Sequence, residues 1–182
     1  HVQLTWDALS RRRLRCTYAT DAWVATSEAG CGSGGVLESA YHYDEGTFGV
    51  GRRTSAVDLT GSETLGYDAR GRVVETTKVV AGVAATISHS DDAADRIATT
   101  THPDGEVVTH GYNAVGGPTS LASDDGTVYL VDVEFDVMGR AVRLERGNGV
   151  VDALEFHGPA QGERLRRISV AGAIHGAGLN PI

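Results

Sequence analysis

Of the 182 residues in this chain 24 are glycine, and the formal net charge at pH 7 is −8. The acidic balance argues against a nucleic-acid surface, because phosphate binding needs a clustered positive field. No apolar run reaches the roughly 18 residues of a membrane-spanning helix, and the N-terminal residues lack the apolar core of a signal peptide, so we expect a soluble chain.

Residues 1–40 are predicted to hold one or more degenerate repeat units and a Gly-rich connection. The phrase "WDALSR" places Trp6 beside Asp7, and the basic run "RRRLR" follows at residues 11–15. We interpret this run as a solvated strand edge rather than as an anion site. The stretch "GCGSGGV" at residues 30–36 lacks the Lys-Ser/Thr pair of a phosphate-binding loop, which favours a flexible connection.

The chain has two cysteines, Cys16 and Cys31, fifteen residues apart. Two cysteines at this spacing do not make a four-ligand zinc site. They form a disulfide if the protein is exported, or they stay as two free thiols. The sequence leaves both alternatives open.

An aromatic-Asp phrase recurs through residues 41–170. It is clearest as "YDARGR" at Tyr67, and the copy "YDEGTFGVGR" at Tyr43 carries four extra residues. After a first interval of 37 residues, successive copies are 21 to 24 residues apart. The second position of the phrase is occupied by Asp7, Asp44, Asp68, Asp92, Asn113, Asp136 and His157.

A second landmark, a turn built on Gly, lies between these copies. Its positions are Gly61, Gly82, Gly105, Gly126, Gly149 and Gly172, which are 21 or 23 residues apart. In the four units without an insertion the Gly follows the Asp column by 13 or 14 residues, and in the unit with four extra residues it follows by 17. Because two landmarks keep phase through an insertion, the pattern indicates a true tandem repeat.

Each unit is predicted to be one β-hairpin. A strand such as "AVRLER" leads to a Gly turn of the Asn-Gly or Asp-Gly kind, and a strand such as "TVYLVDVEF" returns. In the returning strand Tyr129, Val131, Val133 and Phe135 share one apolar face, which we expect to be the more deeply buried. The predicted fold class is all-β, with about six or seven consecutive antiparallel hairpins and a C-terminal tail at residues 171–182.

The aromatic-Asp-x-x-Gly-Arg phrase is predicted to form the turn at the opposite end of each hairpin. Asp or Asn would accept hydrogen bonds from amides two residues on, and Gly would take the left-handed conformation. The aromatic would pack beneath the turn against the next aromatic, and Arg would pair with an Asp of the next turn or stack on an aromatic. The residues predicted to build these turns are Trp6, Asp7, Tyr43, Asp44, Gly51, Arg52, Tyr67, Asp68, Gly71, Arg72, Asp92, Arg96, Tyr112, Asn113, Phe135, Asp136, Gly139 and Arg140.

These turns resemble those of the YD-repeat, or Rhs-repeat, family, whose hallmark is Tyr-Asp-x-x-Gly-Arg recurring about every 20 residues. The resemblance covers residues 1 to about 170. The residues that carry it most fully are Tyr43, Asp44, Gly51, Arg52, Tyr67, Asp68, Gly71, Arg72, Phe135, Asp136, Gly139 and Arg140.

The resemblance implies a spiralling β-sheet strip that forms a hollow shell around a toxic C-terminal polypeptide, as in bacterial Rhs and toxin-complex proteins, or that supports adhesion, as in teneurins. It also implies a bacterial origin and a secreted or cell-surface location. The implied partners are the remainder of the shell, which could pair with edge strands of this segment, and an enclosed C-terminal polypeptide. The family's self-cleavage site and variable toxin do not appear in the tail, so we expect a structural segment that is not an enzyme and has no cofactor.

Nothing in the residue pattern requires catalysis or a metal. His102 and His110 flank one predicted turn and could face each other, but third and fourth zinc ligands are not apparent. The acidic groups at residues 91–95 and 124–125 lack the alternating oxygen ligands of a calcium loop, which favours turn chemistry. Carboxylates that recur in every unit are scaffold by default, and no nucleophile elbow, phosphate loop or dinucleotide fingerprint is present.

A carbohydrate- or surface-ligand-binding repeat module, acting in adhesion, is the second hypothesis. Such modules also use hairpins of about 20 residues, but they usually carry Trp in most units. Here the tryptophans are Trp6 and Trp23, both near the N-terminus. Strong saturable binding in a glycan screen would favour this alternative.

Overall fold

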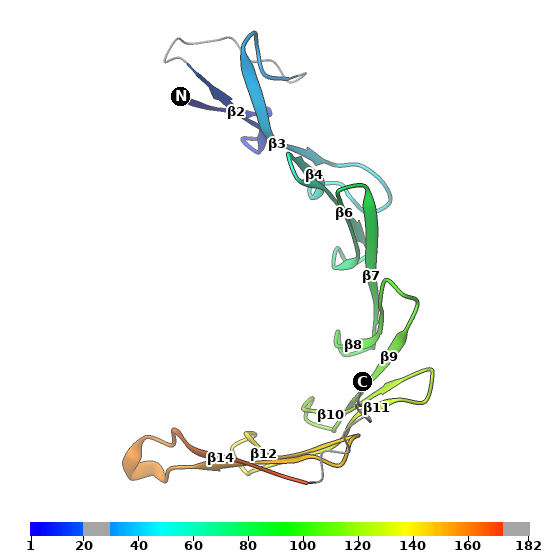
Figure 1. Cartoon of the computed structure of the whole chain (residues 1–182), viewed down its shortest axis with the longest axis vertical. Helices are drawn as coiled ribbons and strands as arrows, with labels where there is room; N and C mark the ends of the chain where they lie inside the picture. The colour runs from blue at the N-terminus through cyan, green and yellow to red at the C-terminus, as the bar shows by residue number, and fades with distance from the viewer. Residues whose placement is uncertain (20–29, 173–182) are drawn as a thin grey trace, which may run out of the picture. The chain divides into compact units, whose positions relative to one another are not determined.

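The computed structural model describes residues 1–19 and 30–172, most of which lie in antiparallel β-strands (Figure 1). In these two ranges fourteen strands pair in sequence order, so that each strand between the first and the last pairs with the strand before it and the strand after it. The prediction of an all-β chain of consecutive antiparallel hairpins is therefore confirmed. The strands are β1 (Val2–Trp6), β2 (Arg12–Tyr18), β3 (Gly35–Tyr43), β4 (Arg53–Asp58), β5 (Gly61–Tyr67), β6 (Val73–Val80), β7 (Val83–Asp91), β8 (Ile97–Thr101), β9 (Val107–Tyr112), β10 (Pro118–Ser123), β11 (Val128–Phe135), β12 (Ala141–Arg146), β13 (Val151–Phe156) and β14 (Leu165–Ala171).

The chain divides into two compact units, His1–Ser88 and His89–Ile182, and the division falls within β7. The domain limits predicted at residues 40 and 170 remain predictions. Trp23 and all but the first two residues of the predicted tail lie outside the described residues. The described part of the chain holds no helix that is long and apolar enough to cross a membrane.

Most hairpins use one turn geometry at both ends. In the Gly turn at residues 102–106 the Gly105 amide donates to the His102 carbonyl at 2.9 Å, and the His102 amide donates to the Glu106 carbonyl at 2.8 Å. The Asp turn at residues 136–140 has the same pair of bonds, at 3.0 and 2.9 Å. In both turns positive φ falls on the Gly alone, 94° at Gly105 and 75° at Gly139. This is the three-residue hairpin turn that ends in a left-handed Gly and a bulge.

The turn between β6 and β7 is different, because only two residues connect the paired Val80 and Val83. Ala81 has φ 50° and Gly82 has φ 80°. Two consecutive positive φ angles define a type I′ turn, which favours Asn-Gly. Ala81 is therefore the less suitable residue in this turn, since its Cβ disfavours the left-handed conformation.

Replacing Ala81 with Asn is expected to raise the free energy of unfolding by about 0.5–1 kcal/mol, because Asn tolerates the left-handed conformation better than Ala. Denaturant unfolding followed by circular dichroism measures the change. Ala69→Asn is the matched control, since Ala69 lies in an exposed turn but is not among the residues with positive φ. An equal gain in both variants would contradict the assignment of strain to Ala81.

The first unit has a small buried cluster at its N-terminal hairpin. It consists of Leu14, Cys16, Tyr18 and Ala40, with Cys31 packed against it. A disulfide joins Cys16, which is fully buried, to Cys31, which lies just before β3. Of the two alternatives that the sequence left open, the structure forms the disulfide. The disulfide therefore adds stability to a cluster that contains few buried side chains.

The apolar face predicted for β11 is buried only in part. Val133 is 7% exposed and Phe135 is half-buried, but Tyr129 and Val131 are 46% and 48% exposed. The predicted face holds the one buried side chain of β11, Val133, and its burial does not extend to Tyr129 and Val131. The only helical element described in this unit is the three-residue 3-10 turn Pro159–Gln161, so side chains on the sheet are covered chiefly by their neighbours on adjacent strands.

Candidate functional site: the repeated turns

Four of the Asp turns are closed by the side chain of their own aspartate. At Asp68, Oδ1 accepts hydrogen bonds from the amides of Arg70 and Arg72, both at 2.9 Å, and Oδ2 accepts one from Arg72 Nε at 2.7 Å. The carboxylate thus satisfies two turn amides and one guanidinium. The same three bonds, all between 2.7 and 3.0 Å, occur at Asp7 with Leu9 and Arg11, at Asp92 with Ala94 and Arg96, and at Asp136 with Met138 and Arg140.

These bonds all favour the charged carboxylate. The amide of Arg72 is the largest cause that lowers the pKa of Asp68, which falls to about 2, and the Arg72 guanidinium adds to it. The pKa values of Asp7, Asp92 and Asp136 are lowered in the same way by their own turn arginines. At neutral pH these aspartates are therefore ionised acceptors, not proton donors.

Acid is expected to weaken the Asp68 turn. The folded pKa lies below the unfolded value of 3.8, so the contribution of this group is fully present above 3.8 and is lost as the pH falls toward 2. The measurement is the melting temperature against pH for the wild type and for Asp68→Asn, which keeps an Oδ1 acceptor but does not titrate. The variant should lose less stability between pH 3.8 and pH 2. Identical slopes would contradict the prediction.

Four turn arginines, Arg11, Arg52, Arg96 and Arg140, also contact the following turn. The guanidinium lies over the aromatic ring of the next copy of the phrase, and the next tyrosine hydroxyl donates to the carbonyl of the residue after the arginine. The guanidinium-to-centroid distances are 4.4 Å for Arg11 over Tyr43, 5.6 Å for Arg52 over Tyr67, 4.5 Å for Arg96 over Tyr112 and 4.3 Å for Arg140 over Phe156. The hydroxyl bonds are 2.9 Å from Tyr43 to Arg12, 2.6 Å from Tyr67 to Arg53 and 2.8 Å from Tyr112 to Ile97.

The turn at Asn113 shows what replaces the arginine. Asn113 Oδ1 accepts from the amides of Val115 at 3.1 Å and Gly117 at 2.8 Å, as Asp does elsewhere. Gly117 stands where the other copies have Arg, and a Cβ there would lie 2.9 Å from Phe135 Cζ. The Phe135 ring therefore packs on the Gly117 backbone in the place of a guanidinium.

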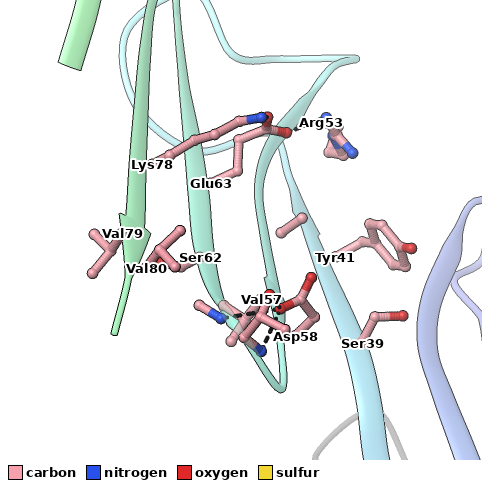
Figure 2. A pocket seen from close by; sticks show the side chains of 13 residues that line it. Ser39, Tyr41, Arg53, Val57, Asp58, Ser62, Glu63, Lys78, Val79 and Val80 are labelled. Carbon is pink, nitrogen blue, oxygen red and sulfur yellow. Dashed lines mark hydrogen bonds and ion pairs between the residues drawn. The ribbon is translucent and has the colours of Figure 1, made fainter. Parts of the chain in front are cut away.

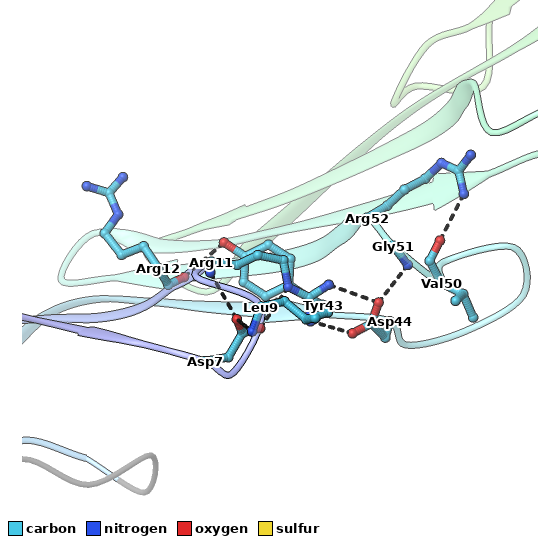
Figure 3. A network of polar contacts seen from close by, with 9 residues as sticks. All are labelled: Asp7, Leu9, Arg11, Arg12, Tyr43, Asp44, Val50, Gly51 and Arg52. Carbon is cyan, nitrogen blue, oxygen red and sulfur yellow. Dashed lines mark hydrogen bonds and ion pairs between the residues drawn. The ribbon is translucent and has the colours of Figure 1, made fainter.

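The turn with four extra residues redistributes its partners (Figure 3). The Asp44 amide still donates to the Arg52 carbonyl at 3.1 Å. In this wider loop the Asp44 carboxylate instead accepts two bonds from Arg11 of the preceding turn, at 3.0 and 2.6 Å, and one from the Gly51 amide at 2.6 Å. The Arg11 side chain is the largest cause that lowers the pKa of Asp44 to about 2. Arg52 instead holds the loop by donating to the carbonyls of Phe48 and Val50 at 3.2 and 3.0 Å.

The predicted turn residues differ in what they do. The pairing of an Arg with the Asp of the next turn occurs at Arg11 with Asp44, whereas Arg96 and Arg140 pair with the Asp of their own turn. Each stacked arginine faces the next aromatic, so the contact between successive aromatics that we expected is replaced by a cation-π contact. Trp6 is 54% exposed. Sequence reasoning did not select Arg11, Gly117 or Phe156, although their places in the repeat could have identified all three.

The two candidate zinc histidines line one surface hollow with Glu106 and Tyr129. His110 Nε2 lies 3.0 Å from Thr100 Oγ1, and the Tyr129 hydroxyl donates to Glu106 at 2.5 Å. Burial is the first cause that lowers the pKa of His110, and the charge of His102 adds to it. Across the described ranges no three His, Cys, Asp or Glu side chains are grouped so that they could hold a metal ion.

Mild acid is expected to destabilise the second unit through His110. Its folded pKa lies below the unfolded value of 6.5, so its contribution is complete above 6.5 and is lost as the pH falls below it. His102 opposes the new charge, whereas Glu106 is engaged by Tyr129. His110→Gln should flatten the fall in melting temperature from pH about 7.5 to about 5. His42→Gln, at a half-buried position of the first unit, is the control, and an equal effect in the two variants would contradict the prediction.

Several solved structures that this fold resembles are toxin complexes. The crystal structure of TcdB2-TccC3-Cdc42 aligns with a TM-score of 0.74 at 15% identity, over 93% of this chain and 9% of that chain. TcdB2-TccC3 without the hypervariable C-terminal region gives the same values. The Photorhabdus luminescens Tc holotoxin pore with a point mutation in TccC3 gives 0.62 at 16% identity, over 93% of this chain and 10% of that chain.

The chain thus has the fold of a β-hairpin segment of these toxin complexes, and it spans about a tenth of the length of their chains. At this identity the likeness shows the fold, and at that level it confirms the resemblance to YD-repeat proteins. No protein-family model and no curated protein sequence matches the chain.

Proposed function

We propose that the chain is a non-catalytic wall segment of a YD-repeat shell that encloses a C-terminal toxin or other polypeptide. The observation that carries this proposal is the chain of contacts from turn to turn. Each stacked arginine meets the aromatic of the next turn, as Arg140 meets Phe156 at 4.3 Å. Successive hairpins are thereby joined along one end as well as by their backbone ladders, which suits a wall that must stay continuous.

The repeated carboxylates support a structural role rather than catalysis. Both oxygens of Asp136 are occupied, Oδ1 by the amides of Met138 and Arg140 and Oδ2 by the Arg140 guanidinium. A general acid or base needs a proton or a lone pair free for substrate and a pKa near the working pH. The lowered pKa of Asp136 moves it away from that range.

The disulfide between Cys16 and Cys31 supports a secreted or cell-surface location. Disulfides persist in oxidising compartments and are rare in reducing ones. A shell protein of bacterial origin that acts outside the cell would meet this requirement. The partners in this proposal are further repeats of the same wall and the enclosed polypeptide.

A chimera tests the proposal. The segment of TcdB2-TccC3 that aligns with this chain is replaced by residues 1–182, and a second chimera receives a Gly-Ser linker of the same length. We expect the first chimera to form a closed particle by electron microscopy and to protect its C-terminal region from added protease, and the linker chimera to do neither. A well-folded particle whose C-terminal region is cleaved as fast as in the linker control would overturn the proposal.

A further inference from the structure

The enlarged turn between β3 and β4 departs from the repeat, and loops of this kind often lie on the face that binds a partner. Its insertion leaves two apolar side chains in solvent, since Phe48 is 50% exposed and Val50 is 75% exposed. Leu9, in the preceding turn, is 70% exposed. The bonds from Arg11 to Asp44 hold the two turns side by side (Figure 3). We call Leu9, Phe48 and Val50 the apolar tips.

The enlarged turn is fixed in one shape by its own backbone. The Arg52 amide donates to the Gly49 carbonyl at 2.9 Å. Gly49 is buried, and a Cβ there would lie 2.8 Å from Thr54 Cγ2, so the backbone at this point packs against β4. Arg52 Nη1 donates to the carbonyls of Phe48 and Val50 at 3.2 and 3.0 Å. The two apolar residues on either side of Gly49 are therefore held in place while their side chains remain exposed.

Phe48 also has a strained backbone. Its φ of 60° lies in the left-handed region, which disfavours a bulky side chain. Strain of this kind concentrates at functional sites, where the surrounding structure maintains it. Asn or Gly would suit this backbone better, and the exposed ring of Phe48 contributes little to a core. A contact outside the chain gives the ring a role that the loop itself does not.

Arg52 places a positive charge at the base of the enlarged turn. The next residue, Arg53, pairs with Glu63 at 2.6 Å (Figure 2). Within residues 1–19 and 30–172 Arg52 has no carboxylate partner, and its Nε and Nη1 donate to main-chain carbonyls. Its Nη2 makes no hydrogen bond in those ranges. A guanidinium with free donors is suited to a phosphate oxygen.

We propose that the apolar tips dock on the surface of a phospholipid bilayer and insert below its headgroups, with Arg52 against lipid phosphate. Interfacial amphipathic segments bind bilayers by the same combination of buried apolar side chains and attraction of basic groups to anionic lipid. Three projecting side chains do not supply the roughly 800 Å² per partner of a stable protein interface, whereas a bilayer needs no complementary surface. The net charge of −8 opposes contact elsewhere on the chain, which favours this end. The inference does not depend on the proposed shell function.

The test is flotation of the 182-residue chain with vesicles of equal parts phosphatidylcholine and phosphatidylglycerol, for which we expect saturable binding. The Phe48→Asn, Val50→Ser double variant should bind at least about tenfold more weakly, since two apolar side chains are lost. Asn suits the left-handed conformation, so the loop should keep its fold. Leu59→Ser is the matched control. Leu59 is 74% exposed, but it lies beside Asp58 at the Gly-turn end of β4, so this variant should bind as the wild type does.

A fluorescent label reports which end of the hairpin enters the bilayer. Because Cys16 and Cys31 are joined in the disulfide, Val50→Cys and Leu59→Cys each provide one free thiol for an environment-sensitive fluorophore. Vesicles should shift the emission of the label at position 50 to shorter wavelength and leave the emission at position 59 unchanged.

Folding and association controls keep the outcome decisive. Circular dichroism compares each variant with the wild type, and if the double variant fails to fold, the pair of labels alone decides. Absence of saturable binding, an equal loss in Leu59→Ser, or an equal shift of both labels would each overturn the proposal. So would sedimentation that shows the chain associating with itself through the apolar tips instead of binding vesicles.

Discussion

Removal of the Cys16–Cys31 disulfide is expected to lower the free energy of unfolding by about 3 kcal/mol. A cross-link that closes a loop of fifteen residues restricts the unfolded chain by about that amount. The loss falls on a unit with a small buried cluster, since Leu14, Tyr18 and Ala40 are the other buried side chains around Cys16. The melting temperature of the Cys16→Ala, Cys31→Ala double variant should fall on the order of 10 °C.

Reduction provides an independent route to the same state. The wild type in a phosphine reductant should melt close to the double variant, and the double variant should not respond to the reductant. The disulfide prediction is falsified if the double variant and the oxidised wild type melt at the same temperature. A response of the double variant to reductant would show that the reagent acts elsewhere.

Replacing the turn glycines with valine is expected to cost about 1–3 kcal/mol at each site. Gly139 has φ 75° with open space around it, so the loss in Gly139→Val measures backbone strain. Gly71 has φ 83°, and a side chain there would collide with the Arg52 guanidinium, which also bonds the Gly71 carbonyl at 3.2 Å. We therefore expect Gly71→Val to cost more than Gly139→Val.

An asparagine variant at the same position distinguishes the cost of backbone strain from any effect of simply removing glycine. Gly139→Asn should cost clearly less than Gly139→Val, because Asn populates the left-handed conformation and a β-branched side chain does not. Denaturant unfolding of the full chain gives the differences. Equal destabilisation by Asn and Val, or unchanged unfolding in Gly71→Val, would argue against the turn assignment.

The fold could be predicted from the sequence because two turn signals recur in phase. Asp68 and Gly71 specify a turn by local chemistry, and the same chemistry tolerates substitution. Ser10 and Asp95 stand in the Gly position with φ 59° and 62°, and Asn113 replaces Asp without loss of the amide bonds. Because these local preferences persist when single residues of the turn phrase are substituted, hairpins could be predicted even for copies that match the phrase incompletely.

Partners across hairpins could not be predicted in the same way. From the sequence, Arg could either pair with an Asp or stack on an aromatic ring. In the structure Arg96 does both, because it bonds Asp92 in its own turn and lies over the ring of Tyr112 in the next. That choice depends on the width of the turn, as the enlarged loop at Asp44 shows. The disulfide depends on how the segment that precedes β3 packs Cys31 against the buried cluster around Cys16, which the repeat pattern does not determine.

The contacts between turns also have a direction along the chain. In each contact the aromatic ring packs on a residue that precedes it in the sequence, as Tyr43 packs on Arg11 and Phe135 on Gly117. A polypeptide that emerges from the ribosome N-terminus first would present each docking surface before the ring that needs it. Because these partners lie a short distance apart in sequence, we expect the hairpins to be added one at a time during synthesis, without waiting for the C-terminal end of the chain.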